Sequence, residues 1–264
     1  MSRVQVLIAT MHQNDHSLLD KMNIQTDAVV GNQCDRNEVE SFEYKGNTVD
    51  WLSFAERGVG LNRNNALMRA KADYCLFADD DMLFRDGYEQ TVIEAFEKNP
   101  KADVLIFNIE EEGETTRRSN DKVKKIGLLS YMNYGAARLV IKRSAVSYGG
   151  VSFNLNFGGG TPHSCGEDTL FLRDCLKAGL KMYAVPYTVA KLTETRESSW
   201  FKGYTEKYFY DKGVVLGIAH PVLGRLFALY LTVRHGEYVS KSEFSKKQIL
   251  KFMLNGIKHK KGDI

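Results

Sequence analysis

The chain has little proline, little cysteine and no long apolar run, and each shortage excludes a class of protein. Four prolines among 264 residues, with 43% hydrophobic and 26% charged residues, exclude a disordered chain and allow a packed core. The four cysteines are scattered without CxxC spacing. Cys75 lies in an apolar run and Cys175 in a helical pattern, so we predict reduced core thiols, which favours the cytoplasm.

Signals for membrane insertion and export are also missing. The longest apolar segment, residues 221–233, is interrupted by Arg225 and is shorter than the roughly 20 residues that a spanning helix needs. The first ten residues predict a buried strand, with no apolar stretch followed by a cleavage site. We therefore expect neither a transmembrane helix nor a signal peptide.

Charge is unevenly distributed along the chain, although the net charge is only +3. Residues 241–261 contain seven lysines and one glutamate, which is +6, so the rest of the chain carries −3. A near-neutral body with a basic tail favours an anionic surface as the partner of the tail. It does not favour nucleic acid, for which the sequence has no reader motif.

Apolar runs alternate with helical patterns through most of the chain, which predicts an α/β fold with a parallel sheet and crossover helices. The expected strands are residues 4–10, 27–32, 47–54, 73–78, 102–110 and 181–186. The expected helices are residues 15–22, 61–70, 86–99 and 166–179. After residue 191 the sequence becomes aromatic-rich and helical, so we place one domain at 1–200 and a helical, basic C-terminal extension at 201–264.

Three consecutive carboxylates, Asp79, Asp80 and Asp81, follow the strongly apolar strand at 73–78. Like charges at the end of a buried strand repel one another, and a divalent cation such as Mg²⁺ or Mn²⁺ is the simplest compensation. Ligands of open α/β sheets also bind beyond the carboxyl ends of strands. The alternative is a solvated acidic loop, which the apolar flanks on both sides disfavour.

A second acidic pair, Glu167 and Asp168, begins the helix at 166–179 and follows a glycine-rich stretch that includes Gly159. Carboxylates in a first helical turn interact favourably with the helix dipole, and this capping role is the simplest interpretation of the pair alone. The glycine-rich stretch favours a functional role, since such a segment lets the backbone approach a bulky ligand and can act as a lid.

Residues 57–74 place two glycines before a helix whose first turn carries Arg63. A helix N-terminus with a nearby arginine is a suitable seat for phosphate. Neither GxxxxGK[ST] nor GxGxxG is present, so this is neither a P-loop nor a dinucleotide fingerprint. From these residues alone, an N-cap at Asn62 and a surface charge at Arg63 remain an equal alternative.

In this order and spacing, the strand VLIATM, the helix GLNRNNAL and the segment ADYCLFADDDMLF resemble the family-2 glycosyltransferases, which are inverting enzymes of the GT-A fold. GEDTLFLRDCLKAGLKMYAVP looks like the base-bearing helix and following strand of that family. The resemblance covers roughly residues 3–200. It implies a Rossmann-like, mostly parallel central sheet with flanking helices, and transfer of a sugar from a UDP-sugar to a glycan or lipid-linked acceptor, as in lipopolysaccharide or capsule assembly.

The resemblance also implies roles on the donor side. Thr10 matches the position that packs against the nucleoside, and Asp35 looks like the residue that reads the uracil edge. Arg63 matches the basic residue near the base or diphosphate. Asp79 and Asp80 would hold the ribose and the metal site, and Asp81 would ligate Mn²⁺ or Mg²⁺.

On the acceptor side, Asp168 matches the general base, with Glu167, Gly159 and His163 as expected acceptor contacts. Asp168 would take the proton of a hydroxyl that attacks the anomeric carbon in one displacement, while the metal and Arg63 offset charge on the leaving diphosphate.

The sequence departs from the family pattern after its last strand, where many GT-A enzymes place a metal-ligating histidine and this chain has Lys191. Lys191 could pair with the diphosphate directly, which puts strict metal dependence in question. His163 and His220 are alternative ligands.

The C-terminal extension contains an amphipathic helix at 244–257, with Ile249, Leu250, Met253 and Ile257 on one face and lysines around it. Two interpretations stay open: an interfacial helix on anionic lipid, which would make the protein peripheral on the inner face of the cell membrane, or packing of the stripe on the rest of the chain. Residues 220–235 offer a second membrane-facing element or a contact between subunits.

Two rival functions remain. A sugar nucleotidyltransferase is also α/β and metal-dependent, but it would place a glycine-rich phosphate loop after its first strand, which this sequence lacks. A non-catalytic metal- or carbohydrate-binding protein would use the aspartates only to hold Ca²⁺, and it would have no turnover to lose on substitution of Asp168.

Overall fold

The computed structural model describes residues 2–111, 119–193, 201 and 203–259. The strands are β1 (Val4–Met11), β2 (Asp27–Gln33), β3 (Glu38–Tyr44), β4 (Asn47–Phe54), β5 (Tyr74–Asp79), β6 (Met82–Phe84), β7 (Val104–Glu110), β8 (Lys124–Ile126), β9 (Leu139–Lys142) and β10 (Met182–Leu192). The α-helices are α1 (Leu18–Lys21), α2 (Val59–Arg69), α3 (Tyr88–Lys98), α4 (Arg143–Tyr148), α5 (Glu167–Lys177), α6 (Glu206–Ala219), α7 (Gly224–Arg234), α8 (Glu237–Ser240) and α9 (Lys246–Ile257).

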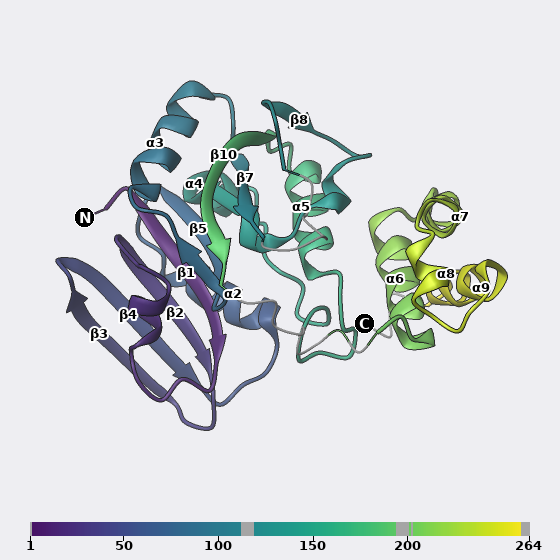
Figure 1. Cartoon of the computed structure of the whole chain (residues 1–264), viewed down its shortest axis with the longest axis horizontal. Coiled ribbons are helices and arrows are strands. Elements are labelled where there is room, and N and C mark those ends of the chain that lie inside the picture. Colours follow the sequence, from purple (N-terminus) through teal and green to yellow (C-terminus); the bar gives the residue numbers. More distant parts are fainter. Residues whose placement is uncertain (1, 112–118, 194–200, 202, 260–264) are drawn as a thin grey trace.

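Within the described residues, the strands form one sheet in the order β3-β4-β2-β1-β5-β9-β7-β10-β6, with β8 paired to β10. Strands β4, β2, β1, β5, β7 and β10 run in the same direction, because β9 is antiparallel to both β5 and β7. The sheet is therefore mostly parallel, as predicted. The carboxyl ends of the parallel strands point toward one edge of the molecule (Figure 1).

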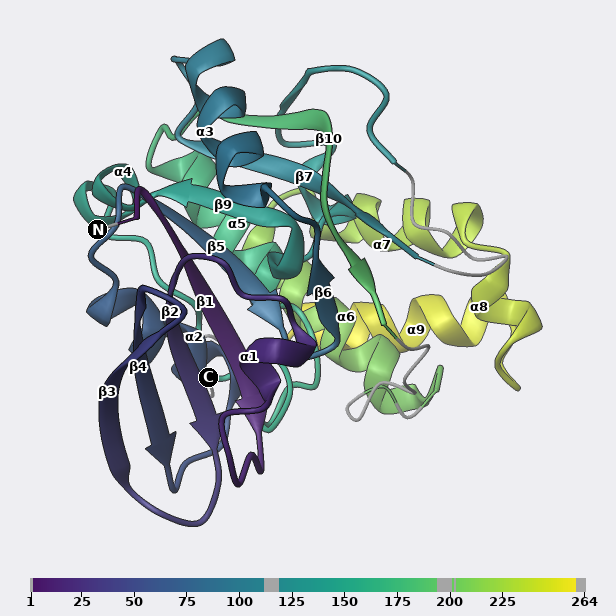
Figure 2. The same cartoon turned by 60° about the vertical axis from the view of Figure 1, so that its left-hand side comes forward.

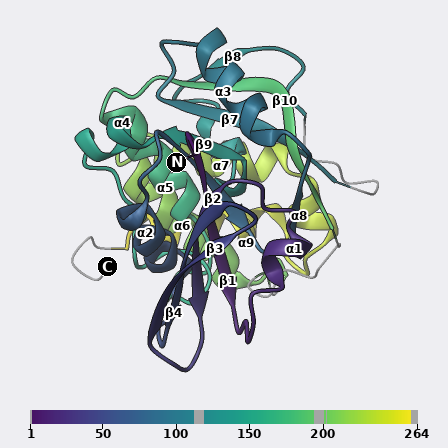
Figure 3. The same cartoon turned by 90° about the vertical axis from the view of Figure 1, so that its left-hand side faces the viewer.

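Helices cover both faces of this sheet, and the alternation of side chains along each strand supplies the two cores. One core packs α1 and α3 on the sheet and contains Ile8 and Leu76. The other packs α2, α4 and α5 on the opposite face and contains Leu7 and Phe77. Figure 2 shows α3 in front of the strands, with α4 and α5 behind them. Figure 3 shows α1 and α2 on opposite sides of the sheet. This three-layer arrangement confirms the predicted fold class.

The two cysteines expected in the core are there. Cys75 and Cys175 are free and fully buried among the side chains of the second core. Burial raises the pKa of each thiol to about 12, so both stay protonated and unreactive at neutral pH.

Helices α6–α9 form a unit beside the sheet (Figure 1) with an apolar cluster of their own around Phe209 and Met253. Helices α6 and α9 touch through backbone, because a side chain at Gly213 would meet the carbonyl group of Met253. A second small cluster, which includes Leu170 and Val215, joins α6 to α5. The unit therefore packs against the helix on which the acidic pair lies.

The structure decides between the two interpretations of the amphipathic helix, α9. Ser245 and Gln248 form a capping box at its start, and Ile249 and Met253 are fully buried against α6. The apolar stripe thus packs on the rest of the chain, and membrane binding through this stripe is wrong. Within the described residues, no helix combines the length and the apolar character needed to cross a membrane.

Candidate active site

The aspartate triplet lies where the sequence predicted, at the carboxyl edge of the sheet. β5 ends at Asp79, and its pairing with β1 sets Asp79 opposite Ala9. The next residue of β1, Thr10, is buried and donates its Oγ1 hydrogen bond to Oδ2 of Asp80 at 2.7 Å. The backbone carbonyl of Asp81 accepts hydrogen bonds from the amide and hydroxyl of Thr193. The chain after β5 is therefore held from two directions.

Arg63 brings the two predicted acidic groups together. Its side chain is only 6% exposed, and its Nη2 donates to Oδ1 of Asp79 at 2.9 Å. Its Nη1 donates to Oδ1 of Asp168 at 2.9 Å and to Oε1 of Glu167 at 3.3 Å. The interpretation of Arg63 as a surface charge is therefore wrong, because α2 buries it against Phe153, whose ring centre lies 5.4 Å from the guanidinium carbon.

Three carboxylates around one guanidinium leave the site with excess negative charge. Burial alone would lower the pKa of Arg63, but Asp79, Asp168 and Glu167 outweigh burial and raise it, so the guanidinium is always charged. Burial, followed by repulsion from Asp168, raises the pKa of Glu167 to about 7 against the attraction of Arg63. Glu167 therefore keeps its proton to a higher pH than an exposed glutamate does.

Glycines allow the chain to close around the acidic pair at the start of α5. A Cβ on Gly158, which has φ +95°, would lie 2.6 Å from the carboxyl carbon of Glu167. A Cβ on Gly135 would lie 3.2 Å from Oδ2 of Asp168. A Cβ at Gly158 would therefore displace Glu167, whereas a Cβ at Gly135 would require Asp168 to shift by only a few tenths of an ångström. The approach of the glycine-rich stretch to a bulky ligand stays a prediction.

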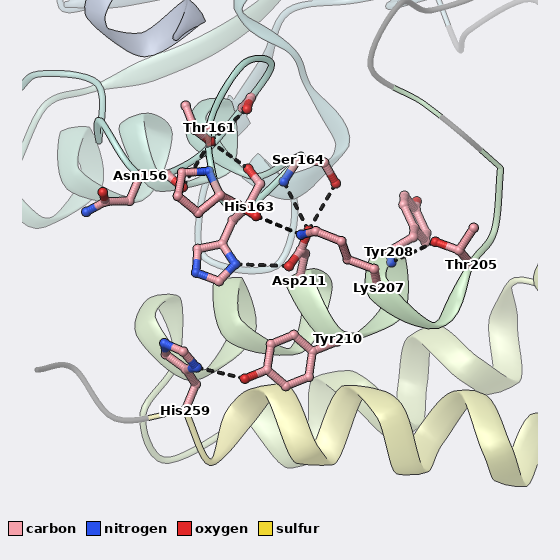
Figure 4. Close-up of polar contacts among 12 residues, drawn as sticks. Asn156, Thr161, His163, Ser164, Thr205, Lys207, Tyr208, Tyr210, Asp211 and His259 are labelled. Atoms are coloured by element: carbon pink, nitrogen blue, oxygen red, sulfur yellow. Dashed lines mark hydrogen bonds and ion pairs between the residues drawn. The ribbon is translucent and has the colours of Figure 1, made fainter. Parts of the chain in front are cut away.

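A buried aspartate that the sequence analysis missed, Asp211 on α6, anchors this glycine-rich loop (Figure 4). Its carboxylate, 1% exposed, accepts hydrogen bonds from the amide and hydroxyl of Ser164 at 3.0 Å each. Nδ1 of His163 lies 2.9 Å and Nζ of Lys207 2.6 Å from the same carboxylate. Burial opposes the charge on Asp211, but Lys207 and His163 outweigh it and lower its pKa.

Each of the two histidines proposed from the sequence as a metal ligand or acceptor contact has a hydrogen-bond partner within the described residues. His163 is buried, stacks on Phe157 with ring centres 4.7 Å apart, and uses Nδ1 on Asp211. His220 is buried at the end of α6, and its Nε2 lies 2.8 Å from the hydroxyl of Tyr131. Each ring is part of the packing of α6 on the rest of the chain, and the roles expected for His163 and His220 stay predictions.

A large cleft of about 3190 Å³ opens over the site. The acidic and basic groups described above line it: Thr10, Arg63, Asp79, Asp80, Asp81, Glu167 and Asp168. Gly159 and Gly160 contribute the backbone of the glycine-rich loop. The far wall comes from the C-terminal unit, which supplies Tyr208 and Lys212 of α6 and Leu226 and Tyr230 of α7. The extension is thus part of the cleft.

Two predicted donor contacts lie outside this lining. Asp35 is exposed on the loop after β2, and the nearby residue that reaches the cleft is Gln33. Lys191 is exposed on β10, where strand alternation turns Ala190 into the core and leaves Lys191 away from the cleft. The expected donor contacts of Asp35 and Lys191 therefore stay predictions.

The carboxylates of the site could hold a hard divalent cation only if the substrate supplies further ligands. Within the described ranges, no three His, Cys, Asp or Glu side chains are grouped closely enough to hold a metal by themselves. Mg²⁺ is commonly held by one or two carboxylates together with substrate phosphates. Asp79 and Asp81, which both line the cleft, fit that pattern.

Comparisons with known proteins agree with this geometry. The model of glycosyl transferase family 2 matches residues 36–177, more than half of the chain, so the chain belongs to glycosyl transferase family 2 and is a glycosyltransferase. A comparison with curated protein sequences finds no match.

Among solved structures, S. aureus TarS 1–349 has the same fold, with a TM-score of 0.55 and 15% identity over 96% of this chain and 71% of that chain. TarS 1–349 in complex with UDP-GlcNAc gives a TM-score of 0.59 at 16% identity, over 96% of this chain and 72% of that chain. A complex of the same protein with UDP gives 0.56 at 16% identity, over 96% and 70%.

Proposed function

We propose that this enzyme transfers a sugar from a UDP-sugar to a hydroxyl group of a glycan or lipid-linked acceptor, with inversion at the anomeric carbon. One observation carries the proposal: Asp79, at the end of β5, and Asp168, at the start of α5, bind the same buried guanidinium within one cleft. A donor held at Asp79 and an acceptor held at Asp168 would therefore meet across Arg63.

The residues that line the cleft and the similar solved structures both support a nucleotide-sugar donor. The S. aureus TarS structures contain UDP-GlcNAc and UDP, which supports a uridine nucleotide for this chain as well. Thr10 and Asp80, joined by a hydrogen bond, form the floor on which the nucleoside would lie. Asp79 and Asp81 would hold Mn²⁺ or Mg²⁺. The bound cation would neutralise charge on the leaving diphosphate.

The acceptor side follows from Asp168, whose side chain is 26% exposed toward the cleft, whereas that of Glu167 is 13% exposed. Asp168 takes the proton of the acceptor hydroxyl, whose oxygen forms a bond to the anomeric carbon as the bond to the diphosphate breaks. The departing electron pair stays on the diphosphate. Attack from the opposite side inverts the centre, so an α-linked donor gives a β-linked product.

Asp168→Asn tests this assignment. General-base catalysis contributes roughly 10²–10⁴-fold, so we expect a loss of that size in UDP release with acceptor present, while UDP binding measured by calorimetry persists. Asp174→Asn is the matched control, since Asp174 lies on the same helix, is 43% exposed and pairs with Arg173. Full activity of Asp168→Asn would contradict the proposal. Activity lost in Glu167→Gln instead would transfer the role of base to Glu167.

The metal assignment has a separate test. Asp81→Ala should abolish transfer and the Mn²⁺-dependent part of UDP binding, and unchanged turnover would remove the metal from the proposal. Formation of pyrophosphate from UTP and a sugar phosphate would instead identify a nucleotidyltransferase. UDP binding without turnover of any sugar donor would identify a binding protein.

A further inference from the structure

Helix α7 buries its small side chains and leaves several of its large apolar side chains exposed. Gly224, Ala228 and Thr232 follow one another at four-residue spacing and are buried. A side chain at Gly224 would lie 2.8 Å from the carbonyl oxygen of Leu216 on α6. Thr232 donates to the carbonyl of Ala228 and lies 3.9 Å from Sδ of Met253 on α9. The helix therefore meets α6 and α9 through these small residues, together with the partly buried Phe227 and Leu231.

The opposite side of α7 carries an exposed apolar surface, which we call the α7 face. It consists of Val222, Leu226, Leu229, Tyr230 and Val233, which recur at helical spacing. Leu226 is 64% and Val233 is 61% exposed. A helix that is apolar on every side is normally covered by protein or lipid, and a contiguous exposed patch marks an interaction surface.

The charged residues of α7 itself are both arginines. Arg225 and Arg234 are exposed at its two ends, and the sequence has no carboxylate between Asp211 and Glu237. Across residues 206–258, nine lysines and arginines stand against four aspartates and glutamates, a net charge of +5. Apolar side chains bordered by arginine, in a basic unit, are the composition of an interfacial helix on an anionic lipid surface.

We propose that the α7 face docks on an anionic phospholipid surface and holds this enzyme there without crossing the bilayer. A second copy of the chain fits less well, since a two-fold contact through this face would bring Arg225 and Arg234 together with no acidic residue on the face to pair with them. Leu226 and Tyr230 also line the catalytic cleft, so the lipid surface would lie at its mouth.

Flotation of the full chain with vesicles tests the proposal. We expect binding to vesicles of phosphatidylcholine with phosphatidylglycerol, and binding on the order of tenfold weaker or less to phosphatidylcholine alone or at high salt. Leu229→Gln with Val233→Gln should weaken binding by about tenfold or more, because both side chains would lose their contact with lipid. Neither residue lines the cleft, so hydrolysis of the donor without acceptor should not change.

Matched substitutions at exposed apolar residues elsewhere are the control. Met68 on α2 and Tyr148 on α4 are 72% and 92% exposed, and Met68→Gln with Tyr148→Gln should leave binding unchanged. Equal loss in both pairs, no binding to either vesicle, or binding that ignores phosphatidylglycerol would each overturn the proposal. A dimer in light scattering that Leu229→Gln with Val233→Gln converts to a monomer would also overturn it, in favour of a second copy.

Discussion

Replacing Arg63 with methionine should destabilise the protein in a pH-dependent way. The change keeps an apolar stem of similar length but leaves Asp79, Glu167 and Asp168 without their shared cation. Breaking a buried ion pair on one side costs about 3–5 kcal/mol. Asp79 is 42% exposed and contributes little to that cost, so Glu167 and Asp168 set its size. We therefore expect a loss of about 3 kcal/mol near pH 8.

The pH dependence follows from the raised pKa of Glu167. Between its unfolded value, near 4.5, and its folded value of about 7, the native state binds more protons than the unfolded chain. The stability that Glu167 contributes is complete below this window and is lost as the pH rises through it. Without Arg63 the folded pKa rises further, so the variant continues to lose stability above pH 7. The difference between variant and wild type should shrink to about 1–2 kcal/mol near pH 5.

Urea unfolding followed by circular dichroism at about pH 5 and about pH 8 measures both values. Arg85→Met is the control, because Arg85 forms an exposed pair with Glu110 at 2.7 Å and should change stability by less than about 1 kcal/mol at either pH. Adding Glu167→Gln to Arg63→Met should restore part of the loss near pH 8. An equal loss at both pH values would refute the reasoning, since Arg63 would then act by packing on Phe153 and not by its charge.

Three further predictions concern the parts around the site. Asp211→Asn should cost about 2–3 kcal/mol and raise the KM for acceptor more than that for donor. Because the folded pKa of Asp211 is lowered, this loss should be present at neutral pH and fade as the pH falls below about 4, which unfolding at several pH values measures. Gly158→Ala should lower kcat and reduce the free energy of unfolding by about 1 kcal/mol or more, because φ is +95° and the new Cβ would contact Glu167. Unchanged kinetics would show that the loop moves to make room for the methyl group. Gly213→Ala should lower the free energy of unfolding by about 1–3 kcal/mol, because the new Cβ would separate α6 from α9. Gly236→Ala, which has nothing near its Cβ, should change the free energy of unfolding by less than about 0.5 kcal/mol. Equal melting temperatures of the two variants would contradict this contact.

The strands that the sequence predicted correctly are those that run parallel in the centre of the sheet. β1, β2, β4, β5, β7 and β10 are apolar on both faces or flanked by clear helical patterns. The strands that it missed, β3, β6, β8 and β9, are the antiparallel ones. β6 and β8 have three residues each, and β9 has four, which is too short for a periodic signal. No local pattern shows that β9 inserts between β5 and β7.

The candidate site was predictable where adjacent residues carried its chemistry. Asp79–Asp81 and the Glu167–Asp168 pair could be found from their clustering, and the structure places both in one cleft. The contact of His163 with Asp211 could not be predicted, because Asp211 lies 48 positions further along the chain and a lone histidine does not indicate its own burial. In the sequence, Asp211 is only an acidic residue inside an aromatic-rich helix. Its role as an anchor of the glycine-rich loop is visible only in the packing of α6 on that loop.

The division of the cleft between two stretches of chain has an evolutionary consequence. The match to glycosyl transferase family 2 ends at residue 177, whereas the far wall belongs to α6 and α7. Substitutions in those helices alter the space that faces the carboxylates while the residues that would carry out transfer stay unchanged. Under the proposed function, remodelling this wall would change which acceptor fits, and we expect natural variants with new acceptor specificities to differ mostly after residue 200.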